Sequence, residues 1–61
     1  MRFSKLENGE HFRLKAIKED HVFFKEDSYT GISIQGNVFE IGESFYFQPE
    51  EKVEKVEKNY G

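Results

Sequence analysis

The side chains that could carry chemistry in this 61-residue chain are few and widely spaced. The chain has no cysteine, so it has neither a thiol nucleophile nor a thiolate metal ligand. Its two histidines, His11 and His21, stand ten residues apart and form no His-x-x-x-His pair of the kind that holds zinc. We expect both imidazoles to lie at the surface or at strand ends.

The remaining polar groups also lack a catalytic arrangement. Adjacent carboxylates occur at Glu19-Asp20, Glu26-Asp27 and Glu50-Glu51, but these pairs fall in predicted loops beside lysines and are expected to be solvated. The serines have no neighbouring base, and the dispersed glycines form no phosphate-binding loop. The sequence therefore predicts a protein that is not an enzyme, with no metal site and no cofactor.

The elements that must position the surface are predicted by the aromatic residues. Seven phenylalanines and three tyrosines occur mostly in short runs that alternate apolar and polar residues, such as 44–48. A period of two places alternate side chains on one face of a sheet. The pattern predicts an all-β fold, a five- to six-stranded antiparallel barrel or rolled sheet that is SH3-like. Such a small core should give a stability of about 3–5 kcal/mol.

We expect strands at residues 10–17, 21–26, 31–35, 38–41 and 44–48, with turns at Gly9, Gly36-Asn37 and Gly42-Glu43. The sixth segment is open to two interpretations. Residues 50–60 suit a short C-terminal helix, with two correctly ordered Glu–Lys pairs. They suit slightly better a last strand that closes the barrel, with Val53 inward and a bulge before Val56. Residues 1–57 are expected to form one domain and residues 58–61 a C-terminal tail.

The net charge and the distribution of basic residues limit the classes of binding partner. The net charge is −3, and residues 28–49 contain no Lys or Arg. A nucleic-acid-binding protein usually carries a basic stripe, so this class is the less favoured one. The sequence has no apolar run of about 20 residues, the length that would span a bilayer, and its start lacks the apolar stretch of a secretory signal. Together with the lack of cysteine, this predicts a cytoplasmic protein without a membrane partner.

The first and last segments of the chain each contain a short motif that resembles a motif of other proteins. Residues 1–12 follow the pattern M-(K/R)-F-x-x-L-x-x-G-x-x-F, and residues 45–56 follow F-x-P-(D/E)-x-x-V-E-x-V. The pairing resembles small uncharacterised proteins of bacteria and their phages. The resemblance implies a compact β domain and no catalytic or binding residues. It differs at Glu50 and Lys55, where such closings often carry Asp and Pro, and the loss of that Pro favours the helix for the tail.

The functional hypotheses are based on the side chains that are predicted to be exposed. If the alternation places Phe12 and Phe45 inward, then Arg13 and Tyr46 point outward, while one phenylalanine of the Phe23-Phe24 pair must be left outside. We predict a partner-binding surface made of Arg13, Phe23, Tyr29 and Tyr46, because aromatic residues and Arg dominate interface energetics. The main hypothesis is a small protein-binding module, monomeric or weakly dimeric, that could serve as a phage-derived accessory factor. The alternatives are a nucleic-acid-binding barrel and a homodimeric structural protein.

Overall fold

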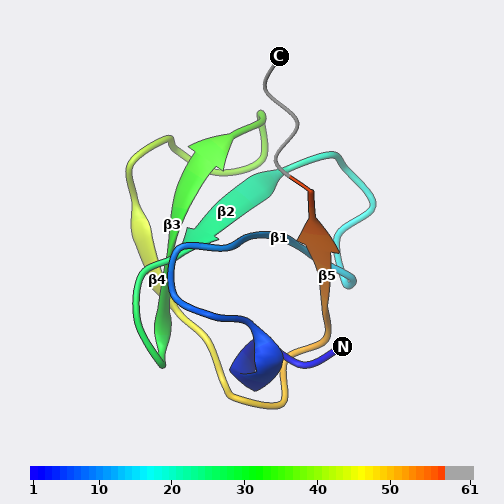
Figure 1. Cartoon of the computed structure of the whole chain (residues 1–61). Helices are drawn as coiled ribbons and strands as arrows, with labels where there is room; N and C mark the ends of the chain where they lie inside the picture. Colours follow the sequence, from blue (N-terminus) through cyan, green and yellow to red (C-terminus); the bar gives the residue numbers. More distant parts are fainter. Residues whose placement is uncertain (58–61) are drawn as a thin grey trace.

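The computed structural model describes residues 1–57, which form one five-stranded antiparallel sheet. The strands are β1 (His11–Leu14), β2 (Val22–Lys25), β3 (Thr30–Gln35), β4 (Ser44–Tyr46) and β5 (Val53–Val56), and a 3-10 turn, η1 (Phe3–Lys5), precedes them. The spatial order is β4-β3-β2-β1-β5, so β4 and β5 are the two edges (Figure 1). The all-β prediction is confirmed as a rolled sheet, which is not closed by pairing between β4 and β5.

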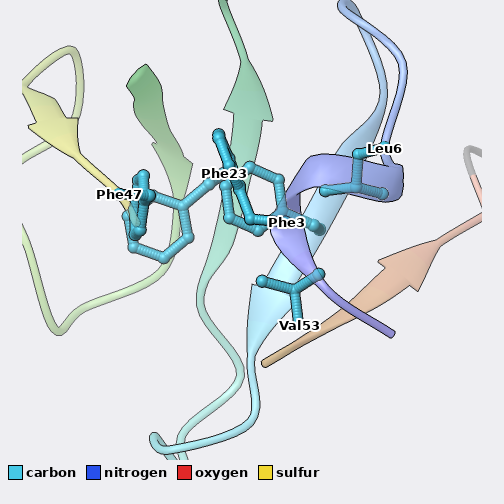
Figure 2. Close-up of a cluster of buried hydrophobic side chains, with 6 residues drawn as sticks. Phe3, Leu6, Phe23, Phe47 and Val53 are labelled. Carbon is cyan, nitrogen blue, oxygen red and sulfur yellow. The ribbon is translucent and has the colours of Figure 1, made fainter. Parts of the chain in front are cut away.

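The core is a cluster of phenylalanine rings on the inner face of the sheet. The ring of Phe12 lies at its centre, with ring centroids 5.3 Å from Phe3, 5.4 Å from Phe23 and 5.5 Å from Phe47. Leu6 and Val53 complete the buried set (Figure 2). Any Cβ on Gly31 of β3 would lie 2.9 Å from the rings of Phe12 and Phe47, so this position needs glycine.

The N-terminal segment covers the open side of the rolled sheet. The amide of Phe3 donates to the Glu51 carbonyl at 2.8 Å, and the amide of Val53 donates to the Met1 carbonyl at 2.8 Å. These bonds hold Phe3 over the core, where its side chain is fully buried. The buried Nζ of Lys25 donates to the carbonyls of Phe3 at 3.0 Å and of Leu6 at 2.6 Å. It also lies 4.5 Å from the centroid of the Phe3 ring.

The predicted strand at residues 38–41 is wrong. Residues 36–43 form one loop between β3 and β4. The amide of Val38 donates to Nδ1 of His21 at 3.2 Å, and Phe39 turns toward the core, 4.9 Å from the ring of Phe45. Ser33 of β3 pairs directly with residues 42 and 43, which leaves no room for another strand between β3 and β4. The two predicted tight turns at Gly36-Asn37 and Gly42-Glu43 are therefore parts of one longer loop, although Gly36 and Gly42, like Gly9, have the positive φ that turn glycines adopt.

The C-terminal interpretation is settled in favour of a strand. β5 pairs with β1 from Leu14 opposite Val53 to His11 opposite Val56, without a shift of register. The helix alternative is therefore wrong, and so is the predicted bulge before Val56. In a regular strand residues three positions apart point to opposite faces, so Val53 is inward and Val56 lies on the outer face. The predicted tail at 58–61 lies outside the described residues.

Among the described residues, no helix is long and apolar enough to span a membrane.

Candidate functional site

Within residues 1–57, the most exposed aromatic surface consists of two stacked tyrosines, which we call the tyrosine pair. Tyr29 and Tyr46 have ring centroids 5.9 Å apart and planes inclined by only 10°. Their exposed fractions are 52% and 66%, so both rings face solvent. Tyr46 points outward from β4, because the neighbouring Phe45 and Phe47 turn toward the core. The alternation in the sequence predicted this orientation, and the turn signal predicted an exposed Tyr29.

The loop before β3 holds Tyr29 in place. Oδ1 of Asp27 accepts hydrogen bonds from the amide of Tyr29 at 2.9 Å and from the amide of Thr30 at 2.8 Å. This is the turn that Asp forms when its side chain caps the backbone two residues further on. The carbonyl of Tyr29 in turn accepts from the amide of Phe47 at 2.7 Å. Tyr29 is thus bonded on both sides and is preorganised beside Tyr46.

The same hydrogen bonds keep Asp27 negatively charged. The Tyr29 amide, followed by the Thr30 hydroxyl, lowers the pKa of Asp27 below its ordinary value of 3.8. The Thr30 hydroxyl lies 2.7 Å from Asp27 Oδ1 and 3.1 Å from Glu26 Oε1, and its single proton can serve only one of them at a time. Because Thr30 lies directly opposite Tyr46 in the sheet, these carboxylates adjoin the tyrosine pair.

Beside the tyrosine pair, β4 presents a free backbone edge. In the described part of the chain β4 pairs only with β3, and Phe45 is the residue that faces Gly31 as a hydrogen-bonded pair. In an antiparallel ladder the hydrogen-bonding residues alternate, so the amides and carbonyls of Ser44 and Tyr46 point away from β3. Both residues are exposed. As far as residues 1–57 are concerned, this edge has unpaired donors and acceptors, and β4 itself carries no charged side chain.

The opposite edge is different. On β5, Val53 is already bonded to Met1 through both its amide and its carbonyl. A bridge between Arg2 and Lys52 extends this cover. Lys55, whose backbone groups also point away from β1, carries a charge, and its Nζ lies 2.7 Å from Glu10 Oε2. Charged side chains and covering segments are the usual protection of an edge strand, and β5 has both.

The structure brings together only two of the four residues predicted for the surface. Tyr29 and Tyr46 stack, whereas Phe23 is 1% exposed and belongs to the core. The prediction for Phe23 is therefore wrong, and Phe24 is the member of that pair on the outer face, where its ring lies 5.7 Å from that of His11. Arg13 lies on β1, separated from β4 by two strands. Its Nε lies 2.6 Å from Asp20 Oδ1, without the alignment of a hydrogen bond.

Three buried polar side chains were not predicted, and each has a structural partner. His21 lies at the predicted strand end but is buried, 1% exposed. Because its Nδ1 accepts from Val38, its Nε2 carries the proton and donates to Ser33 Oγ at 2.6 Å. Lys25 is occupied by the carbonyls of η1 and its cap. No group of three or more potential metal ligands occurs within residues 1–57. The tyrosine pair and the β4 edge therefore remain the candidate site.

Comparison of the chain with protein-family models, with curated proteins and with solved structures finds no match in any of the three.

Proposed function

We propose that this protein is a binding module that takes up an extended segment of another protein along the free edge of β4. The single observation that carries the proposal is the asymmetry of the two edges. β5 is covered by the N-terminal segment and flanked by charged residues, whereas β4 offers the unpaired backbone groups of Ser44 and Tyr46. An exposed edge is a template for strand addition, in which main-chain hydrogen bonds supply affinity.

The tyrosine pair supplies the side-chain contact for such a segment. In an added strand, the residue opposite Tyr46 would have its Cβ about 4.5–5.5 Å from that of Tyr46, on the same face. Tyrosine rings add large contact area at low entropic cost, which is why they are enriched at the centres of interfaces. Since β4 is only three residues long, the bound segment would be short and its affinity modest.

The setting of this activity is also part of the proposal. We propose a cytoplasmic module, because a chain without cysteine gains nothing from an oxidising compartment. The resemblance of its termini to small bacterial and phage proteins would make it an accessory factor, and the SH3-like description of its rolled sheet remains a prediction. A nucleic-acid ligand is less favoured, because Glu26 and Asp27 adjoin the tyrosine pair and would repel phosphate.

The test is a selection from a displayed library of random peptides against the full chain. Selected peptides should lower the hydrogen-exchange rates of the Ser44 and Tyr46 amides, while the Phe45 amide, already bonded to β3, changes little. Ser44→Pro removes one outward amide and should abolish the binding. Lys55→Pro makes the same change on β5 and should leave binding intact.

Two results would overturn the proposed function. The first is a library that yields no binder. The second is a set of binders that protect other amides or tolerate Ser44→Pro. Light scattering across a range of concentration provides a further check, because stable self-association through β4 would show that the edge is used by a second copy, as a homodimeric structural protein requires.

A further inference from the structure

We infer that the segment received by β4 is basic, with an arginine side chain placed against the exposed ring of Tyr46. This inference rests on the proposed function and specifies the chemistry of its partner. It is drawn from the charges around the edge, which the proposed function does not use.

The charges carried by β3, β4 and the loops next to them have one sign. Residues 26–48 contain four carboxylates and no Lys or Arg. These acidic residues, all exposed, are Glu26, Asp27, Glu40 and Glu43. The region includes all of β3 and β4, so an incoming strand would meet no positive charge from either of these strands. A cationic partner is attracted to such a surface, and an anionic one is repelled.

Two of these carboxylates are linked to the place where the partner's side chain would lie. Glu26 and Asp27 both contact the hydroxyl of Thr30, and Thr30 is the cross-strand neighbour of Tyr46. The backbone hydrogen bonds to Asp27 hold it in position and leave its other carboxylate oxygen, Oδ2, outside these bonds. A guanidinium opposite Tyr46 would therefore have an aromatic face on one side and fixed negative charge nearby.

The tyrosine pair fits a guanidinium better than it fits an apolar side chain. Arginine stacks on aromatic faces, and its planar group is weakly hydrated, so it loses little on contact. An apolar residue would gain from the ring but would have to lie among carboxylates. The two rings are already parallel, so a guanidinium can extend the same stack. The same charges also disfavour pairing of β4 with a second copy of itself, since two acidic surfaces would meet.

The experiment uses the full chain and three short blocked peptides that alternate valine with a variable residue. The variable residue is arginine, its neutral isostere citrulline, or glutamate. We expect the arginine peptide to shift the amide resonances of Ser44 and Tyr46 and to bind about three- to tenfold more tightly than the citrulline peptide. This preference should shrink at high salt. The glutamate peptide should not bind.

Variants identify the contact. Tyr46→Leu should reduce the preference for arginine over citrulline to the part that the carboxylates supply, and Tyr46→Phe, which keeps the ring, should retain it. Asp27→Asn should reduce the preference for arginine over citrulline, because it removes one of the two carboxylates linked to Thr30. These differences are ratios between peptides on one protein, so a general loss of stability cannot produce them.

The outcomes separate this inference from the proposed function. If all three peptides shift the Ser44 and Tyr46 resonances equally, the edge binds strands but the basic partner is wrong. If library-selected peptides bind the edge and are neutral or acidic, the inference again fails while the proposed function stands. If none of the defined peptides binds, the inference fails. If a single-stranded oligonucleotide shifts the tyrosine pair instead, both fail.

Discussion

Replacing Lys25 by methionine tests how the N-terminal segment is held over the core. Methionine keeps the unbranched stem of lysine but removes the ammonium group that bonds Phe3 and Leu6. The Phe3 carbonyl keeps the Leu6 amide as a second donor, at 3.1 Å, whereas Lys25 Nζ is the only donor found for the Leu6 carbonyl among the described residues. The substitution thus leaves one carbonyl without a partner and removes one charged group from beside an aromatic ring.

Two opposing effects set the change in the free energy of unfolding that Lys25→Met should cause. A hydrogen bond to a charged group contributes about 1.5–3 kcal/mol, and the ammonium over the Phe3 ring adds about 0.5–2 kcal/mol. Against this, the variant no longer desolvates an ammonium, which costs several kcal/mol per ion in a protein interior. Because breaking one side of a satisfied buried contact usually dominates, we expect Lys25→Met to lower the free energy of unfolding by about 1–3 kcal/mol. That is a large share of the stability of about 3–5 kcal/mol expected for this core.

The assay is urea denaturation of the full chain, with Lys15→Met as the control because Lys15 is exposed. With a denaturant slope of about 1 kcal/mol per molar urea, the midpoint of Lys25→Met should fall by about 1–3 M. The control should shift by less than about 0.5 kcal/mol. Faster amide exchange at Leu6, whose amide bonds the Phe3 carbonyl, should accompany the loss. An unchanged or higher midpoint would refute the reasoning, since it would mean that burial of the ammonium costs more than its contacts contribute.

Two further predictions concern the loops. Because hydrogen bonds lower the pKa of Asp27 from its ordinary value of 3.8, its stabilisation is fully present above that value and is lost as the pH falls through the folded-state pKa. Asp27→Asn should therefore lower the urea midpoint at neutral pH, and the difference from wild type should disappear in the acid range; a constant difference would contradict the prediction. Gly36→Ala should destabilise by more than Gly42→Ala in thermal melts. Both glycines have positive φ, but only at Gly36 would a Cβ collide with the ring of His21. Equal effects would mean that the loop adjusts around the added methyl group.

The strands were predictable because their alternation is local. Phe12, Phe45 and Phe47 all face the core, as a period of two predicts, whereas alternation alone did not decide between Phe23 and Phe24. The same rule failed at residues 38–41, which alternate just as well. There the Val38 amide bonds His21, and only Phe39 reaches the core, while Ile41 is 60% exposed. His21, whose bond to Val38 helps to hold this segment as a loop, lies 17 residues away in the chain, so the local pattern gives no indication of it.

The candidate site was only half predictable for a related reason. Exposure of Tyr46 follows from alternation, and exposure of Tyr29 follows from the turn signal that Asp27 begins. Their stacking depends on the pairing of β3 with β4, and the free edge depends on where β4 lies in the sheet. Buried Lys25 could not be foreseen, since lysine is almost never buried without a partner, and here its partners are backbone carbonyls 19 and 22 residues away.

The bonds between the first residues and the last strand bear on when the molecule can fold. Met1 and Val53 are joined across 52 positions of sequence, and Phe3 depends on the carbonyl of Glu51 for its place in the core. During synthesis the N-terminal segment leaves the ribosome long before β5 does. Contacts of such high sequence separation form late and close a long loop at an entropic cost. Phe3 can therefore take its place in the core only after residues 51–53 have left the exit tunnel.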